Sequence, residues 1–347
     1  MRPIPQARGV LILAAAFLVA PIAQARAPRQ SPARNPGAIK GAVLWRDPGS
    51  VETLDFAHGP GGAAGVPRGP FRFIEELGDG TVAKLKVRDA GGRVWVMKWG
   101  SEAKAETFAS RVAWAAGYFV LPSYFVRSGR VTGARSLGRA SGQVDPSGRF
   151  RDARFQAWES RYLRENNWTW TYNPFVGKRE LGGLKVVMML TSNWDSKDAR
   201  DVDIGSNTAI IDRSQPGRPE YRYLITDWGG SMGKWGPFPV HDKWNCNGFA
   251  DQSENLVKGV KDGIVEWGYS GTHDLSEGIS VDDVRWLLRM VRRITDSQLR
   301  AGLRASGAAP QEVECFARGL RVRIRQLQGA ARSGERKLTR VSPRSSS

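Results

Sequence analysis

The sequence of 347 residues contains few of the residues on which most hydrolases and zinc proteins depend. It has three histidines and two cysteines, at His58, His241, His273, Cys246 and Cys315. These positions do not show the spacing of a zinc site, and the shortage of histidine argues against a Ser-His-Asp hydrolase. The two cysteines are compatible with one disulfide in an oxidising compartment, although the sequence alone does not establish that they are close.

Acidic residues are also few, because 34 Asp and Glu face 52 Lys and Arg, a formal net charge of +18. The simplest interpretation is solvated arginine on the protein surface. Such a charge also favours anionic partners, such as a phosphorylated envelope polymer, lipid head groups or an acidic protein substrate. Nucleic acid is not expected as a partner, since no nucleic-acid-binding motif accompanies the charge.

Long apolar runs are limited to one, from Val10 to Ala20. Arg2 and Arg8 precede it and Ala23-Gln24-Ala25 follows it, which is the pattern of a secretory signal peptide over residues 1–25. The alternative is an uncleaved membrane anchor, for which the run is short. We therefore expect an exported protein, periplasmic or extracellular, with no transmembrane span once the signal is removed.

Composition divides the remainder into four parts. We expect a disordered basic arm over 26–44, a sheet region with one helix over 45–156, a helical region over 157–328 and a disordered basic tail over 329–347. Capping-box spacings at Ser280 and Thr295 mark the starts of C-terminal helices. A segment rich in aromatic residues, 166–175, is interpreted as a loop held by buried tryptophans, with a sugar-stacking surface as the alternative.

The sheet region contains a candidate ion pair. Strands over 71–77, 83–87 and 93–99 are separated by turn signals, the first of which contains Gly78 and Gly80. Lys98 lies at the end of the third strand. A helix begins near Ser101, and its Glu106 shares a face with small residues that allow close approach to the sheet.

Two further carboxylates lie in the stretch from Thr191 to Gly233. Asp195 and Lys197 follow a short apolar helix over 180–190, and Asp227 follows a strand over 221–225. An aspartate that orients a hydroxyl, a cation for the phosphate and a carboxylate for the metal are the groups that phosphoryl transfer requires. The stretch therefore predicts a phosphoryl-transfer site, although each residue taken alone is also typical of an ordinary turn.

These residues, in this order, resemble a pattern known from protein kinases. The motifs are Val96-Met97-Lys98-Trp99-Gly100, 105–111, Asn173-Pro174-Phe175, 193–198 and Thr226-Asp227-Trp228-Gly229. The sequence resembles an exported bacterial family of unassigned function with a protein-kinase-like pattern, and is more distantly similar to HipA-like and secretory-pathway atypical kinases. The resemblance implies an α+β, two-lobed kinase-like fold, with a small antiparallel sheet lobe carrying one helix and a larger helical lobe.

The resemblance also implies roles for individual residues. Lys98 and Glu106 would position ATP, with help from Gly78 and Gly80. Asp195 and Lys197 would be catalytic. Asp227 would hold Mg²⁺ or Mn²⁺ together with Asn207. The sequence departs from the pattern at Arg200, where the metal-binding Asn is expected, so Asp201 and Asp203 are further candidates.

Two functional hypotheses follow. The first is an exported phosphotransferase that uses a nucleotide and a divalent metal on a protein or envelope-polymer hydroxyl. The second is a catalytically inactive module of the same pattern that binds an anionic envelope polymer or a partner protein. The sequence does not decide between an enzyme and a binding module.

Overall fold

The structure, a computed structural model, describes residues 40–78, 80, 82–163, 168–197, 202–236, 242–269 and 274–339. The side chains of Lys197 and of residues 334–339 are outside the described part. The expected signal peptide at 1–25 also lies outside the described residues. Within them, none of the helices combines the length and hydrophobicity that crossing a membrane requires.

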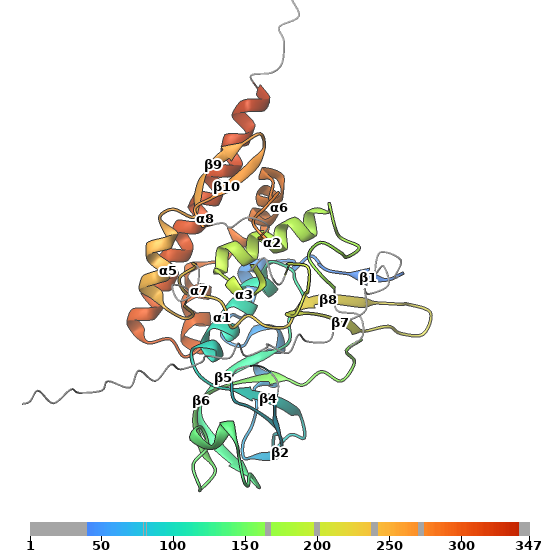
Figure 1. The fold of residues 1–347 in the computed structure, drawn as a ribbon, viewed down its shortest axis with the longest axis vertical. Helices are drawn as coiled ribbons and strands as arrows, with labels where there is room; N and C mark the ends of the chain where they lie inside the picture. Colours follow the sequence, from blue (N-terminus) through green and yellow to red (C-terminus); the bar gives the residue numbers. More distant parts are fainter. Residues whose placement is uncertain are drawn as a thin grey trace, which may run out of the picture. The chain divides into compact units, whose positions relative to one another are not determined.

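Five strands form a closed barrel (Figure 1). They are β2 (Phe71–Leu77), β3 (Lys84–Arg88), β4 (Val94–Lys98), β5 (Ser123–Thr132) and β6 (Arg149–Ala157). Their order around the barrel is β2-β3-β4-β6-β5, and β2 closes it by pairing in parallel with β5, Phe71 opposite Val131. In β4 the side chains of Trp95 and Met97 are fully buried in the barrel core. Because successive side chains alternate between faces, Lys98 lies on the outer face.

The expected two-lobed kinase-like fold is wrong, although the α+β class is confirmed. The sheet is a closed barrel with one parallel pair rather than a small antiparallel sheet. Helix α1 (Ser101–Ala115), expected to belong to a sheet lobe, contacts β5 and β6 but buries Phe108 and Val112 in the core of the helical region. The apolar face of α1 that contains Phe108 and Val112 therefore packs on the helical region, so α1 connects the barrel to the helices and is not part of a separate sheet lobe.

The helical region is built around one large hydrophobic core. Its helices are α2 (Arg179–Thr191), α3 (Trp194–Lys197), α5 (Cys246–Ser253), α6 (Val281–Val291), α7 (Asp296–Ala305) and α8 (Pro310–Thr339). Ser280 and Thr295 form the capping boxes that the sequence predicts. Trp168 and Trp170 are buried, which confirms the interpretation of their segment as a loop held by tryptophans. Helix α8 runs on to Thr339, beyond the start of the expected tail.

Two small sheets accompany the helices. Strand β8 (Tyr221–Ile225) lies between β1 (Ala42–Val43), with which it is parallel, and β7 (Thr208–Asp212), with which it is antiparallel. Strands β9 (Val257–Lys261) and β10 (Ile264–Trp267) form a hairpin. The short 3-10 helices are η2 (Val51–Thr53), η3 (Gly59–Gly61), η4 (Ala63–Gly65) and η5 (Arg139–Gly142). The β7–β8 hairpin matters for function because Asp227 follows its second strand.

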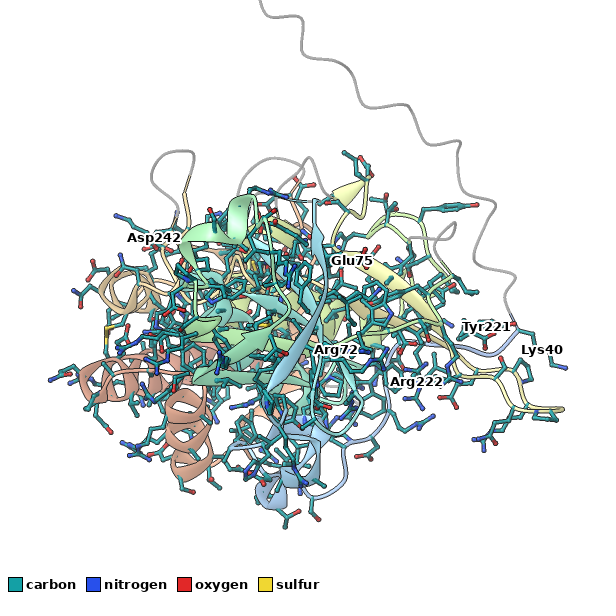
Figure 2. The ribbon with its side chains drawn as sticks, turned by 90° about the horizontal axis from the view of Figure 1, so that it is seen from below. Lys40, Arg72, Glu75, Tyr221, Arg222 and Asp242 are labelled. Atoms are coloured by element: carbon teal, nitrogen blue, oxygen red, sulfur yellow. A yellow bond between two sulfur atoms is a disulfide. The ribbon has the colours of Figure 1, made fainter. Side chains whose placement is uncertain are left out.

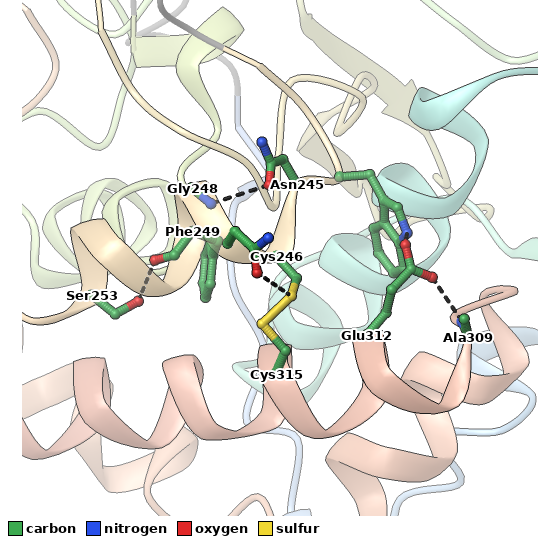
Figure 3. The surroundings of a disulfide bond; sticks show 10 residues. Asn245, Cys246, Gly248, Phe249, Ser253, Ala309, Glu312 and Cys315 are labelled. Atoms are coloured by element: carbon green, nitrogen blue, oxygen red, sulfur yellow. Dashed lines mark hydrogen bonds between the residues drawn. A yellow bond between two sulfur atoms is a disulfide. The ribbon is translucent and has the colours of Figure 1, made fainter.

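A disulfide joins Cys246, at the start of α5, to Cys315 in α8 (Figure 3). One turn before Cys315, Glu312 accepts a hydrogen bond of 2.9 Å from the indole nitrogen of Trp244. These two links attach the segment before α5 to α8. That segment contains Lys243, which reaches the candidate site.

Candidate functional site

Lys98 lies among three carboxylates. Its ammonium nitrogen is 2.5 Å from Glu102, 2.5 Å from Glu106 and 3.3 Å from Asp227. Only 5% of the Lys98 side chain is exposed. Burying an ammonium group requires opposite charges within hydrogen-bonding distance, and these three carboxylates supply them. The predicted Lys98–Glu106 pair is therefore present, but it is part of a larger cluster.

Helix α1 supplies the two glutamates. Glu102 and Glu106 are four residues apart, so they project from the same face of the helix. Lys98, one residue before the loop that leads into α1, lies on the outer face of the barrel against which the helix packs. The short connection through Gly100, with a φ of 81°, turns the chain from strand to helix. The arrangement thus follows from the local sequence between 98 and 106.

Two more cations surround the glutamates. Arg154 of β6 lies opposite Lys98 in the strand register and forms an ion pair with Glu106. Lys243 forms an ion pair with Glu102. Burial works against ionisation of Glu102, yet Lys98 and Lys243 lower its pKa below the ordinary value. The candidate site thus contains four carboxyl groups and three cationic groups. They are Glu102, Glu106, Asp195 and Asp227, and Lys98, Arg154 and Lys243.

Asp227 is placed by the β7–β8 hairpin. Its side chain is 34% exposed, whereas those of Lys98 and Glu106 are almost completely buried. Burial works against its ionisation, but Lys98 and the backbone N–H of Gly229, which donates a 2.7 Å hydrogen bond, hold its pKa well below the usual range. Asp227 is therefore an ionised carboxylate with access to solvent. This combination suits a metal ligand.

Asn207 lies at the same end of the hairpin. Its carbonyl oxygen accepts a 2.9 Å hydrogen bond from the backbone N–H of Thr226, immediately before Asp227. The structure therefore brings the Asn207 segment beside the Asp227 segment, as the predicted metal pair requires. Asp203 instead accepts a hydrogen bond from Thr171, and Arg200 and Asp201 lie outside the described residues.

Asp195 is positioned by the glycines that follow Asp227. The backbone N–H of Trp194 donates a 3.1 Å hydrogen bond to the carbonyl oxygen of Gly230. A Cβ atom on Gly230 would lie 3.0 Å from both the nitrogen and the Cβ of Asp195. A Cβ atom on Gly229 would likewise lie 3.2 Å from the Cβ of Glu102 in α1. The Gly-Gly pair thus allows Asp195, Asp227 and helix α1 to meet.

Burial raises the pKa of Asp195 to about 6, and repulsion from Asp227 contributes. Lys243 opposes the shift. Complete burial likewise raises the pKa of Glu106 to about 7, with Arg154 opposing and Asp227 contributing. A carboxylate whose pKa lies near neutral pH can accept a proton from a hydroxyl more readily than an ordinary one. Asp195 therefore suits the role of a base, and Glu106 suits a buried partner of Lys98.

The oxygen atoms of Glu102, Glu106 and Asp227 lie within 4.8 Å of one another, which is close enough to share one cation. Carboxylate oxygens are the donors that Mg²⁺ and Mn²⁺ prefer, so the donor set fits either metal. Lys98 lies 2.5 Å from each glutamate but 3.3 Å from Asp227. Asp227 is therefore the carboxylate least committed to Lys98 and the one best able to bind a metal.

Two groups of predicted residues are not connected to this cluster by the contacts that the structure describes. Gly78 and Gly80 are exposed in the β2–β3 turn, and their carbonyl oxygens accept hydrogen bonds of 2.5 and 2.6 Å from Arg139. The turn lies at the same end of the sheet as Lys98, because Lys84 pairs with Lys98. Lys197 ends α3, and its side chain is outside the described part.

Several residues of the site were not predicted from the sequence. Glu102 is not among the predicted residues, although its spacing of four from Glu106 signals a shared helical face. Arg154 and Lys243 come from distant parts of the chain and carry no local signal. Arg323 of α8 is fully buried and donates a 3.1 Å hydrogen bond to the carbonyl oxygen of Leu190, near the end of α2. It fixes the helix that leads to Asp195.

The chain contains one Gly-x-Ser-x-Gly match, from Gly229 to Gly233. This spacing marks the nucleophile of many hydrolases when the serine is exposed and paired with a base. The Ser231 side chain is fully buried, and its hydroxyl forms no hydrogen bond within the described part of the chain. These five residues bring Asp195 and Asp227 together rather than presenting a serine.

Replacing Gly230 with alanine tests this close approach. The added methyl group would displace Asp195, so we expect a loss of about 1–3 kcal/mol in the free energy of unfolding. Urea unfolding gives the measurement. Gly142→Ala is the control, because a Cβ there meets no heavy atom within 4 Å. Equal stability of the two variants would contradict the packing that we describe.

Comparison with known proteins does not assign a family. No protein-family model matches the sequence, and the search of curated proteins finds no match. The kinase-like resemblance therefore stays a prediction, and the function has to be argued from the geometry of the site.

Proposed function

We propose that this protein transfers a phosphoryl group from a nucleotide, such as ATP, to a hydroxyl group of a protein or an envelope polymer. The observation that carries the proposal is the meeting of Lys98, Glu106, Asp195 and Asp227, which come from four separate elements of the chain. Phosphoryl transfer depends mainly on positioning and on charge, and this cluster supplies a cation, a metal ligand and a base.

Each residue has a role that follows from its surroundings. The ammonium group of Lys98, while still paired with Glu106, would exchange its contact with Asp227 for the phosphate oxygens of the nucleotide. Asp227, with the neighbouring Asn207, would hold Mg²⁺ or Mn²⁺. A bound divalent metal neutralises charge that develops on the phosphoryl oxygens. Asp195 orients the acceptor hydroxyl and takes its proton, for which its raised pKa is suited.

One observation favours the second hypothesis, a binding module without activity. Lys98 is engaged by three carboxylates. In this arrangement its ammonium group is not free to contact a nucleotide. The basic surface would then serve to bind an anionic polymer or a partner protein.

Export is a part of the proposal that rests on two features. The first is the apolar run from Val10 to Ala20, with its basic residues and its small residues. The second is the bond between Cys246 and Cys315, since disulfides persist mainly in oxidising compartments. Both support a protein that works in the periplasm or outside the cell.

Transfer of a labelled γ-phosphate from ATP in the presence of Mn²⁺, to the protein itself or to water, tests the proposal. We expect turnover that falls as the pH drops below about 6, because protonation of Asp195 removes the base. The same raised pKa means that the folded protein binds this proton more tightly than the unfolded chain. Its contribution to stability therefore decreases as the pH rises from the ordinary value of 3.8 toward 6.

Asp227→Asn is the control for this assay, since it preserves shape but removes the charge that a metal needs. Turnover by wild type that is absent in this variant supports the proposal. Absence of transfer by wild type at every pH, together with no binding of ATP and Mn²⁺, would favour the binding module instead.

A further inference from the structure

A second charged site lies at the turn of the β7–β8 hairpin, away from the acidic cluster. It is a hollow of about 190 Å³ whose lining includes four arginines and one carboxylate: Arg161, Arg213, Arg218, Arg222 and Glu220. Figure 2 shows Arg222 near Tyr221, the first residue of β8. Arg222 and Asp227 are five residues apart, which corresponds to about 17 Å along an extended chain. The hollow is therefore separate from the proposed catalytic site.

Backbone pairing brings the four arginines together. The carbonyl oxygen of Arg161 accepts a 3.0 Å hydrogen bond from the backbone N–H of Asp212, so the segment at 161–163 lies along β7. Two reciprocal hydrogen bonds of 2.9 Å between the backbones of Gln215 and Arg218 close the turn. Arginines from distant parts of the chain thus face one hollow because the sheet places them there.

Two of the arginines are held by carboxylates. Arg213 forms an ion pair with Glu159, and Arg222 forms one of 2.6 Å with Glu220. The second oxygen of Glu220 is 3.1 Å from Arg46. Glu220 is therefore shared between two cations. These pairs fix the walls of the hollow. Asp212 adds a third carboxylate beside Arg161 and Arg213, so five arginines are balanced by three carboxylates and positive charge remains in excess.

The other two arginines are not held in this way, although Arg161 lies close enough to Asp212 and Glu159 for its charge to act on both carboxylates. The guanidinium groups of Arg161 and Arg218 form neither a hydrogen bond nor an ion pair with any residue that the structure describes. Each guanidinium has five N–H donors in a plane, and pairs of these donors match two oxygens of a phosphate. A hollow of about 190 Å³ has room for one tetrahedral phosphate group together with some water.

We propose that this hollow binds a phosphate group, either as free inorganic phosphate or as the phosphomonoester of a larger molecule. Arg161 and Arg218 bind its oxygens, and Arg213 and Arg222 supply further positive charge while their carboxylates hold them in place. The proposal does not depend on nucleotide chemistry at Asp195 and Asp227. Phosphate binding at this hollow would give some of the excess basic residues of the chain a specific role.

Isothermal titration of the full chain with inorganic phosphate, and separately with glycerol 3-phosphate, tests the proposal. We expect Arg161→Ala with Arg218→Ala to weaken phosphate binding by about tenfold or more, since charge-assisted hydrogen bonds are lost. The control is Arg72→Ala with Arg127→Ala, two exposed arginines of the barrel, of which Arg72 is labelled in Figure 2. This pair removes the same charge elsewhere, so it should keep an affinity close to that of wild type.

The two ligands distinguish the source of the phosphate. If the loss of Arg161 and Arg218 weakens the binding of both ligands equally, the result supports a site for a phosphomonoester. If it weakens only the binding of inorganic phosphate, the result supports a site for the free ion. Equal weakening in both double variants, unchanged affinity in the Arg161 and Arg218 variant, or no saturable binding by wild type would overturn the proposal. None of these results depends on whether the protein is an enzyme.

Discussion

Lys98→Met is expected to lower the free energy of unfolding by about 3–5 kcal/mol at neutral pH, because it leaves buried carboxylates without their shared cation. Glu102 and Glu106 lie 2.5 Å from the Lys98 nitrogen, and both are buried. Methionine fills a similar volume, so the loss would reflect charge rather than a cavity. Unfolding in urea, followed by fluorescence of the tryptophans, measures it.

The dependence of this loss on pH separates a charge effect from a packing effect. Without Lys98, the clustered carboxylates of the folded variant have raised pKa values and take up protons as the pH falls. The folded variant then binds more protons than the unfolded chain, so the loss shrinks toward acid pH. The matched control is Lys86→Met. Lys86 lies 3.0 Å from Glu75 in a more exposed pair, for which we expect a change below about 1 kcal/mol. A loss independent of pH, or equal in the two variants, would contradict the charge network.

Asp195→Asn is expected to lower the turnover of phosphoryl transfer by about 10²–10⁴-fold, the usual contribution of a positioned base. The amide has the same shape as the carboxylate but cannot accept the proton of the hydroxyl group. Binding of the nucleotide with Mn²⁺ should be retained, because Asp227 is unchanged. The effect should therefore appear in kcat rather than in binding.

Asp203→Asn is the matched control for this change. Asp203 is exposed and accepts a hydrogen bond of 2.6 Å from Thr171, so its replacement should leave turnover close to wild type. Near-normal turnover in Asp195→Asn would show that Asp195 is not the base. Equal loss in the two variants would show that the effect comes from charge in general.

The predictable part of the site is the part built from neighbouring sequence. Lys98 ends a strand whose side chains alternate, and Glu106 lies on the helix that follows at once, so their pairing can be predicted from local periodicity. Glu102 lies on the same helical face, so the same periodicity also predicts that its side chain lies near Lys98. Asp195 and Asp227 were predicted from their positions after a helix and after a strand, and the structure brings them together.

The unpredicted part depends on contacts between distant residues. Closure of the barrel requires β2 to pair with β5, Phe71 with Val131, and no local pattern signals a parallel pair across sixty residues. For that reason the prediction of a small antiparallel sheet lobe is wrong. Lys243 reaches Glu102 only because its segment is attached to α8 through Trp244 and the disulfide. The sequence can suggest this disulfide but cannot place it.

The most direct test of the account is isothermal titration of the wild-type protein and Asp227→Asn with a non-hydrolysable ATP analogue in the presence of Mn²⁺. Binding needs no acceptor, so the result does not depend on the unknown substrate. We expect saturable, Mn²⁺-dependent binding by wild type, and no such binding by Asp227→Asn at equal stability. Absence of binding by wild type, or equal binding by both proteins, would contradict the proposal that this cluster holds a metal and a nucleotide.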